Sequence, residues 1–310
     1  MNRQTVTVAA DAAGIEAAIT LLRAGQIVAL PTETVYGLAA DAADGDAIAR
    51  IYAAKGRPSF NPLIVHVSGV AMAETLVEIP PLARDLIRRF WPGALTLVLP
   101  LKPGARIASL VTAGLPTLAV RCPAHPVMQA VIAGLGRPLA APSANASGRI
   151  SATTAVHVAA SLGDRVPLIV DGGPTSAGLE STIVAIDGER ATLLRPGAIP
   201  AEALGIALEV AGATITAPGQ LASHYAPSQP LRLNALTASQ TEFHIGFGAV
   251  AGDLNLSVAA NLAEAAANLF AALHTAEASE SHGIAVAPIP ATGLGVAIND
   301  RLHRAAAPRG

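Results

Sequence analysis

Hydrophobic and polar positions follow two different periods over roughly the first two thirds of the chain. Short apolar or β-branched runs bounded by turn residues predict strands; these runs are Ile27–Leu30, Leu63–Val67, Thr96–Leu99, Thr117–Cys122, Pro138–Ala141, Leu168–Asp171, Thr182–Ile186 and Ala191–Leu194. Helical spacing separates several of them, at residues 15–22, Asp46–Ala54, Pro81–Phe90, Pro126–Leu135 and Thr153–Leu162. Such a mixture indicates an α/β fold in which helices pack on a sheet.

This pattern breaks in the segment TAPGQLASHYAPSQP, which ends at Pro230 and contains three prolines and a glycine. That composition is typical of a linker. We therefore predict a first domain at residues 1–214, a linker at 215–230 and a small second domain at 231–310. Within the second domain we predict strands at Phe243–Phe247 and Ile284–Ala287, and helices at Asn261–Leu273 and Arg301–Ala307.

High hydrophobicity raises the question of a membrane span. Of the 310 residues, 52% are hydrophobic and 14% charged, and the mean hydropathy is +0.48. A span takes ~20 consecutive apolar residues, whereas the stretch Gly283–Ile298 is interrupted by Pro288, Pro290, Gly293 and Gly295. We interpret it as a short buried strand followed by a loop. The first residues lack the apolar run of a secretory signal, so we expect a cytoplasmic protein with no membrane partner.

Charge, cysteine content and motifs narrow the function classes further. A single cysteine, Cys122, excludes an internal disulfide and a cysteine-based zinc site. The net charge of −2 argues against general attraction to nucleic acid. The common nucleotide-binding loops, the zinc helix and the serine-hydrolase elbow are also absent from the sequence. Function must then lie with polar residues at strand ends, where α/β sheets place ligands.

Several segments after predicted strands concentrate polar residues. PTETVYGL (31–38) indicates the wall of a polar pocket or, at even odds, a helix N-terminus capped by Thr32 or Thr34. In KGRPSFNPLIVHV (55–67), Lys55 and Arg57 suit phosphate or carboxylate oxygens, or else the dipole of a helix end. AAPSANASG (140–148) allows close approach of a ligand to the backbone, and GLESTIV and LLRPG follow later in the chain.

The period of two in the strand Thr117–Cys122 separates two faces. Thr117 and Arg121 share one face, whereas Cys122 lies on the other among core residues. We therefore interpret Cys122 as a buried thiol and not as a nucleophile. An arginine that projects from a core strand requires an anionic partner or a wet cleft.

Alternation also predicts the faces of His66 and Arg195. His66 shares a face with Ile64, and Arg195 shares a face with Leu193. A lone strand histidine is more often structural than catalytic. Four basic residues nevertheless lie at predicted strand ends beside hydroxyl and amide groups: Lys55, Arg57, Arg121 and Arg195. Together they indicate a site for a polyphosphate and a carboxylate, and hence a nucleotide-dependent enzyme.

Taken in order, these segments resemble a known family. PTETVYGL, KGRPSFNPL, FWPGALTLVLP, TLAVRCP, AAPSANASG, LESTI and LLRPG are similar to motifs of the YrdC-like threonylcarbamoyl-AMP synthases. SHYAP and the tail IAVAPIPATGLGVAINDRL resemble the long, two-domain form of that family. The resemblance implies a YrdC-like twisted mixed sheet with flanking helices, followed by a small C-terminal Rossmann-like α/β domain.

The resemblance also implies a reaction. L-threonine and bicarbonate form a carbamate, which attacks the α-phosphate of ATP to give threonylcarbamoyl-AMP and pyrophosphate. The product would pass to a separate tRNA threonylcarbamoyl transferase complex, which modifies tRNA next to the anticodon. Mg²⁺ would bind with ATP, with no dedicated metal site in the protein. Direct binding of tRNA is left open.

Roles carried over by the resemblance fall on four groups of residues. The threonine pocket would contain Thr34, His66, Arg121, Ala141 and Ser181. The ATP contacts would be Arg57, Asn61, Thr117, Ser143, Ser151 and Arg195. Lys55 and Arg57 would act near the phosphates as catalytic residues, and Tyr225 in the linker would form part of a lid.

Two other functions remain as alternatives. Some carbamoyltransferases contain a YrdC-like domain, but they carry additional zinc-finger segments that a single cysteine cannot build. A non-catalytic RNA-binding module is the second alternative, although nine aromatic residues and a balanced charge offer little for base stacking or phosphate tracking.

Overall fold

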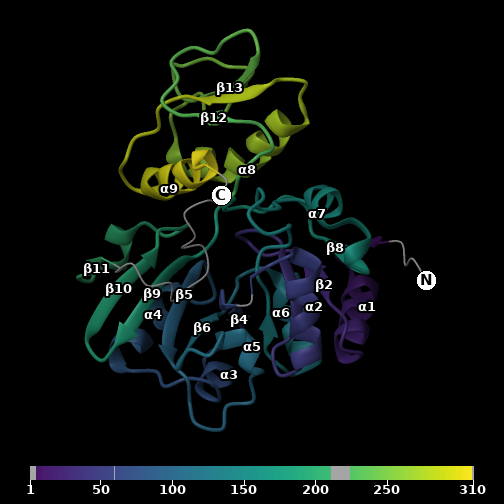
Figure 1. Ribbon diagram of the computed structural model, residues 1–310. Coiled ribbons are helices and arrows are strands. Elements are labelled where there is room, and N and C mark those ends of the chain that lie inside the picture. The colour runs from purple at the N-terminus through teal and green to yellow at the C-terminus, as the bar shows by residue number, and fades with distance from the viewer. Residues whose placement is uncertain (1–4, 59, 211–223, 309–310) are drawn as a thin grey trace.

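The computed structural model describes residues 5–58, 60–210 and 224–308, and Figure 1 shows them as two stacked domains. The strands of the first domain are β1 (Val6–Ala9), β2 (Val28–Leu30), β3 (Gly37–Asp41), β4 (Ile64–His66), β5 (Leu95–Pro100), β6 (Thr117–Arg121), β7 (Leu139–Ala140), β8 (Leu168–Asp171), β9 (Thr182–Asp187), β10 (Arg190–Arg195) and β11 (Glu209–Val210). Its α-helices are α1 (Ala12–Arg23), α2 (Gly45–Lys55), α3 (Val70–Glu74), α4 (Pro81–Phe90), α5 (Ser109–Thr112), α6 (Pro126–Leu135) and α7 (Ala155–Leu162).

All strands of the first domain belong to one mixed sheet, so the predicted α/β class is confirmed. Their order is β1-β8-β2-β3-β7-β4-β6-β5-β9-β10-β11. β4 and β6 are parallel neighbours, and His66 is the partner of Arg121 in their register. β5 runs antiparallel to β6 and parallel to β9. The parallel pairing of β4 with β6 therefore places His66 and Arg121, at the C-terminal ends of these strands, side by side.

The segment PTETVYGL is a chain reversal between two strands. β3 follows it and runs antiparallel to β2. The Thr32 hydroxyl donates to the carbonyl of Val35 at 2.6 Å and accepts the amide of Thr34 at 3.1 Å, which closes the turn. The alternative of a helix N-terminus in this segment is therefore wrong, because the threonine side chain satisfies the backbone of a turn.

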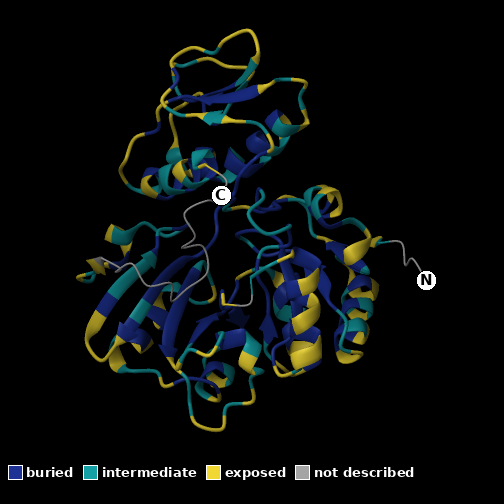
Figure 2. Cartoon of the chain, in the orientation of Figure 1, coloured by how far each residue is buried: buried dark blue, intermediate teal, exposed yellow. Residues whose placement is uncertain are grey.

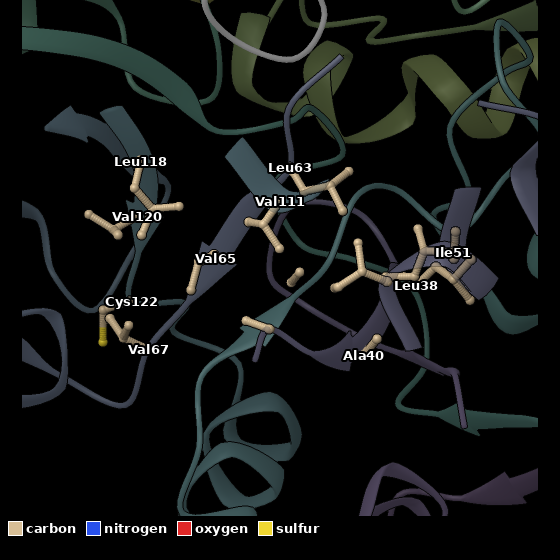
Figure 3. Close-up of a cluster of buried hydrophobic side chains, with 14 of the residues drawn as sticks. Leu38, Ala40, Ile51, Leu63, Val65, Val67, Val111, Leu118, Val120 and Cys122 are labelled. Carbon is tan, nitrogen blue, oxygen red and sulfur yellow. The ribbon is translucent and has the colours of Figure 1, made fainter. Parts of the chain in front are cut away.

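The two faces of the central strands carry different residues. Figure 3 shows Leu63, Val65 and Val67 beside Val120 and Cys122 in the main apolar core. The opposite face carries a small cluster around Ile64, Val98, Ala119 and Ile183. The alternation predicted for both strands is confirmed, including a buried Cys122, whose thiol has its pKa raised mainly by burial.

The second domain is a small parallel sheet with two helices. Its strands are β12 (Leu231–Arg232), β13 (Glu242–Gly246), β14 (Leu254–Asn255) and β15 (Gly283–Val286), in the order β12-β15-β13-β14. Its helices are α8 (Leu262–Ala278) and α9 (Leu294–Ala306). Figure 1 shows both helices between this sheet and the first domain. Residues 215–223 of the predicted linker lie outside the described residues.

The prediction that a loop ends the stretch Gly283–Ile298 is wrong, because α9 begins at Leu294. Gly295 does not break this helix. A Cβ at that position would lie 1.8 Å from the carbonyl oxygen of Pro290, so the glycine is required by the close approach of the preceding loop. None of the helices in the described parts of the chain is long and apolar enough to cross a membrane.

Candidate active site

A pocket of about 570 Å³ opens where the C-terminal ends of β4, β6 and β10 meet the turn after β2. Figure 2 shows buried strands beneath it, and β4 and β6 are the most buried of the three. The pocket is lined by Thr32, Thr34, Val35, Gly37, Arg57, Ile64, His66, Arg121, Ala141, Pro142, Ser143, Glu180, Ser181, Arg195, His224 and Tyr225. This volume includes the open solvent at the mouth of the pocket.

The structure brings most of the predicted site residues together. Those that line the pocket are Thr34, Arg57, His66, Ala141, Ser143, Arg121, Ser181, Arg195 and Tyr225. Lys55, Asn61 and Ser151 are buried and bind residues of the pocket wall. Thr117 lies elsewhere, in a second hollow of the sheet.

Arg121 is held by contacts that leave its side chain 4% exposed. Its Nη1 donates to the Thr34 hydroxyl at 2.8 Å, its Nε donates to the carbonyl of Gly93 at 3.1 Å, and its Nη2 lies 2.6 Å from Glu33 Oε1. Burial acts to raise the pKa of Glu33, but the charge and hydrogen bonds of Arg121 lower it overall. The anionic partner that a buried arginine requires is thus Glu33, which the sequence analysis did not single out.

His66 is an uncharged side chain in the wall of the pocket. It shares a face with Ile64, as predicted, because both residues line the pocket. Burial, together with the charge of Arg121, lowers its pKa to about 3. Its Nδ1 finds no hydrogen-bond partner among the described residues. The imidazole is therefore neutral at physiological pH and has one nitrogen available to a ligand.

Lys55 and Arg57 are placed by the end of α2. Gly56 adopts a left-handed φ of 59° and ends the helix between them. Arg57 reaches the pocket, and its Nε and Nη2 donate to the carbonyls of Asn61 and Pro62 at 3.2 and 2.9 Å. Burial lowers the pKa of Arg57 to about 10, so it keeps its charge at neutral pH.

Lys55 lies beneath the pocket and not in its wall. Its Nζ donates to the carbonyl of Ser143 at 2.5 Å and to that of Asn145. Complete burial, with the nearby charge of Arg57, lowers the pKa of Lys55 well below its ordinary value. Its contacts support the loop AAPSANASG from below, so this geometry fits a positioning residue better than one in contact with substrate.

Arg195 faces the pocket, but not for the reason predicted. A β-bulge shifts the register of β10 between Leu193 and Arg195, so Arg195 pairs with Ile183 of β9. Leu193 packs against the main core, whereas Ile183 belongs to the opposite face. The prediction that Arg195 shares a face with Leu193 is wrong, because the extra residue of the bulge reverses the alternation. Arg195 Nη2 donates to the carbonyl and the hydroxyl of Ser181 at 2.9 and 3.2 Å.

Glu180 is a second carboxylate that the sequence analysis did not single out. Its Oε1 accepts a hydrogen bond from the Ser151 hydroxyl at 2.5 Å, and its Oε2 accepts one from Arg301 at 2.7 Å. Ser151 therefore reaches the pocket through Glu180. The signal in the sequence was the motif GLESTIV itself, in which a carboxylate stands beside hydroxyl groups before a buried strand.

The segment His224–Tyr225 closes one side of the pocket. Tyr225 has a positive φ of 62° and is buried. Its ring makes an edge contact with His224, with ring centroids 4.1 Å apart. Burial is the main cause that lowers the pKa of His224 to about 3. The predicted lid residue thus forms a wall of the pocket in this structure.

Thr117 lies on the same sheet face as Arg121, at the opposite end of β6. Its hollow also contains Val98, Pro100, Ala185 and Thr192. Thr117 and Arg121 are four residue steps apart along the strand, a distance of about 13 Å at ~3.3 Å per residue. Ala119 lies between them in the apolar cluster of this face. Only an elongated ligand can contact both Thr117 and Arg121.

No group of three or more potential metal ligands occurs among the described residues. The carboxylate oxygens of Glu180 are each engaged by a protein donor, and Glu33 is paired with Arg121. The described pocket is therefore suited to anions through its arginines, and a cation would enter it together with an anionic ligand.

The sequence matches two families along its length. A family described as "Telomere recombination", whose label joins Sua5, YciO and YrdC, matches residues 20–197. A second, described as "Threonylcarbamoyl-AMP synthase, C-terminal domain", matches residues 189–307.

Similar proteins agree with these matches. The threonylcarbamoyl-AMP synthase of Bacillus subtilis is 41% identical over 329 residues, covering 95% of this chain and 93% of that protein. The one from Pyrococcus abyssi is 39% identical over 319 residues, covering 94% and 93%. The crystal structure of P. abyssi Sua5 with L-threonine superimposes with a TM-score of 0.88 at 36% identity, covering 98% of this chain and 97% of that one. E. coli YciO shares the fold of the first domain, with a TM-score of 0.56 at 21% identity.

Proposed function

The chain belongs to the Sua5/YrdC family of threonylcarbamoyl-AMP synthases, and from this premise we propose how its pocket receives the substrates. The enzyme forms L-threonylcarbamoyladenylate and pyrophosphate for the threonylcarbamoyladenosine modification of tRNA. One observation carries the proposal. Three guanidinium groups, those of Arg57, Arg121 and Arg195, line one pocket beside a neutral histidine. Such a pocket suits substrates that carry a carboxylate and phosphates.

L-threonine binds at the Arg121 end of the pocket. Arg121 is already oriented by Thr34 and Glu33, so its guanidinium meets the carboxylate of the amino acid without reorganisation. The free Nδ1 of the neutral His66 accepts a hydrogen bond from the substrate. Ala141 leaves room beside the backbone, and Ser181 closes this end. That P. abyssi Sua5 was solved in complex with L-threonine supports threonine as the substrate.

ATP binds at the end formed by Arg57, Arg195 and the loop that contains Ser143. Both guanidinium groups are fixed to backbone carbonyls, of Asn61 and Ser181 respectively, so their charges stand ready for the phosphates. Ser151 acts through Glu180. Thr117 contacts the nucleoside end, because its hollow lies on the same sheet face beyond the apolar cluster.

The chemistry requires no nucleophile from the protein. The amino group of threonine and bicarbonate form a carbamate with loss of water. A carbamate oxygen then attacks the α-phosphorus of ATP, and the bond from that phosphorus to the bridging oxygen breaks as pyrophosphate leaves with the electron pair. Both reactants are anionic, so fixed guanidinium groups supply most of the stabilisation of the transition state. The buried Cys122 takes no part.

Mg²⁺ would be held by the phosphates of ATP, where it would reduce the negative charge that faces the carbamate. This ion prefers phosphate oxygens and water, which fits a pocket whose Glu180 is already engaged by Ser151 and Arg301. Within the pocket, Arg57 and Arg195 face the anionic side of such a complex. Lys55 keeps the loop at Ser143 in place.

The product leaves for a separate tRNA threonylcarbamoyl transferase complex, and we place both enzymes in the cytoplasm. A mixed anhydride of a carbamate and AMP is an activated acyl donor, so a transferase that accepts it must follow. Direct binding of tRNA is not needed for the synthase reaction.

Release of pyrophosphate tests this function. Purified protein is incubated with MgATP, L-threonine and bicarbonate, and each substrate is omitted in turn. We expect release only when all three are present. Turnover without threonine, or with carbamoyl phosphate in place of bicarbonate and threonine, would indicate a carbamoyltransferase. Tight RNA binding with steep salt dependence and no ATP turnover would indicate the RNA-binding module instead.

A further inference from the structure

Arg301 belongs to α9 of the second domain, but its guanidinium lies directly behind Glu180, a residue of the pocket wall in the first domain. The side chain is 0% exposed. Its Nε donates to Glu180 Oε2 at 2.7 Å, its Nη2 to the carbonyl of Pro196 at 3.0 Å, and its Nη1 to Asp300 Oδ2 at 2.6 Å. One side chain thus fixes a carboxylate of the pocket and the residue that follows Arg195.

Arg301 also contacts the segment that closes the pocket. Its guanidinium carbon lies 5.1 Å from the centre of the Tyr225 ring, within the range of a cation–π interaction. Tyr225 holds a positive φ of 62°, a conformation that surrounding contacts must stabilise. Phe270 of α8 lies on the same ring, with centroids 5.5 Å apart. The second domain therefore positions Tyr225 from two helices.

The charges around Arg301 balance one another. Glu180 and Asp300 face it, and Arg195 also interacts with Glu180. Burial acts to raise the pKa of Glu180, but the charges of Arg301 and Arg195 with the Ser151 hydrogen bond lower it overall. Without Arg301, the buried carboxylate keeps Arg195 as its cationic neighbour. Arg195 is then drawn toward Glu180 and away from an incoming phosphate.

We propose that Arg301 is a positioning residue for the synthase reaction, through which the second domain holds Glu180, the Arg195–Pro196 strand end and Tyr225 in the arrangement that binds ATP. Arg301 itself lines no part of the pocket and touches no substrate. This role rests on the proposed assignment of the Arg195 end of the pocket to ATP. It makes the second domain a component of the active site, because the side chain that holds the wall residue Glu180 comes from α9.

Steady-state pyrophosphate release by Arg301→Met and Arg301→Lys tests the role. We expect Arg301→Met to raise the KM for ATP by roughly tenfold to a hundredfold, because misplaced binding groups cost rates of this order. The KM for L-threonine should change far less. Arg301→Lys keeps the charge but cannot bond Glu180, Asp300 and Pro196 together. Its KM for ATP should therefore lie between those of the wild type and Arg301→Met.

The double variant Arg301→Met with Glu180→Gln tests the pairing of these two residues. Its KM for ATP should rise by less than the two single effects combined, because the double variant leaves no unpaired buried carboxylate.

The matched control is Arg232→Met. Arg232 also belongs to the second domain and pairs with a glutamate, Glu242. Its guanidinium also donates to the backbone carbonyl of Thr237, and Arg232 lies outside the pocket. Its kinetics should equal those of the wild type. Thermal unfolding identifies the variants that fold, and Arg301→Lys provides the test if Arg301→Met does not fold.

The role of Arg301 is overturned if folded variants at this position keep the wild-type KM for ATP, or if the KM values for ATP and threonine rise equally. A wild-type chain that releases no pyrophosphate would instead overturn the proposed function, together with the role that rests on it.

Discussion

Arg121 is buried, with its side chain 4% exposed, and three neighbours hold its guanidinium in place. Thr34, Gly93 and Glu33 each occupy one nitrogen of the guanidinium. The group is therefore fixed in direction before a ligand arrives. Burial, and after it the charge of Arg121, lowers the pKa of the adjacent His66 and keeps that side chain neutral.

Substitution of Arg121 and of Arg195 should affect the KM values of different substrates. Arg121→Ala should raise the KM for L-threonine by roughly tenfold to a hundredfold, with a smaller effect on ATP, because the carboxylate loses a charged partner. Arg195→Ala should show the reverse. Steady-state pyrophosphate release with each substrate varied measures both constants. Equal changes in the two KM values for both variants would contradict the division of the pocket.

Single residues could be predicted from the sequence when their own segment contained the signal. His66 and Cys122 were placed on their correct faces by alternation alone. Glu33 and Arg301 were not singled out as site residues, because each one is defined by a partner far away in the sequence. The motif GLESTIV contains the carboxylate of Glu180 but gives no sign of its pairing with Arg301. No local pattern reveals such a pair.

At the scale of elements, irregular geometry limited the predictions. The bulge in β10 turned Arg195 to the pocket face, whereas strict alternation predicts the opposite. α9 begins at Leu294 within a stretch rich in glycine and proline. Gly295 is part of this helix, and its lack of a side chain allows the preceding loop to pack against it. Helices with regular spacing were predicted well, and α4 and α6 have the predicted bounds. Strand order came from tertiary pairing, which periodicity does not contain.

Gly178, in the loop before β9, lies close to the backbone of α8. Its φ is +68°, and a Cβ there would lie 2.5 Å from the carbonyl oxygens of Ala266 and Ala267. Gly178→Ala should therefore lower the stability of the domain interface by more than the ~1–3 kcal/mol of backbone strain alone.

Gly188 is the matched control for Gly178, since its φ is +60° and nothing lies within 4 Å of its Cβ position. Gly188→Ala introduces the strain without the collision. Thermal unfolding should give a larger loss for Gly178→Ala than for Gly188→Ala. Equal losses would show that the contact with α8 contributes nothing.

His157 of α7 stacks on His274 of α8, with ring centroids 3.9 Å apart. Burial first, and then the neighbouring histidine, lowers the pKa of His157 to about 4, and burial lowers that of His274 as well. An unfolded histidine titrates near ~6.5. Between these values the unfolded chain binds protons that the folded stack does not, so the free energy of unfolding falls as the pH falls from about 6.5 toward 4.

We expect the melting temperature to decrease over this pH range, and His157→Gln to make the decrease shallower. His66 and His224 have lowered pKa values in the same direction, so part of the slope should remain. Calorimetry at several pH values measures the slopes. An unchanged slope in His157→Gln would exclude the stack as a source of acid sensitivity.

On the scale of the whole molecule, the pocket is built by both domains. The first domain supplies the arginines at the strand ends, and the second domain supplies Arg301 and supports Tyr225 through α8 and α9. Figure 1 shows these helices facing the first domain. The general α/β architecture and the family could be predicted from the order of motifs. The contribution of the second domain could not, because it depends on how the domains pack.

The central claim is that one pocket joins a carbamate made from threonine and bicarbonate to the α-phosphate of ATP. The most direct measurement uses carbon-labelled bicarbonate and ATP labelled at the α-phosphate, followed by separation of the products. The account predicts one new product that contains both labels in equal amounts, formed only with L-threonine and matched by an equal amount of pyrophosphate. Labelled AMP or ADP without carbon label, at the same rate with and without threonine, would contradict it.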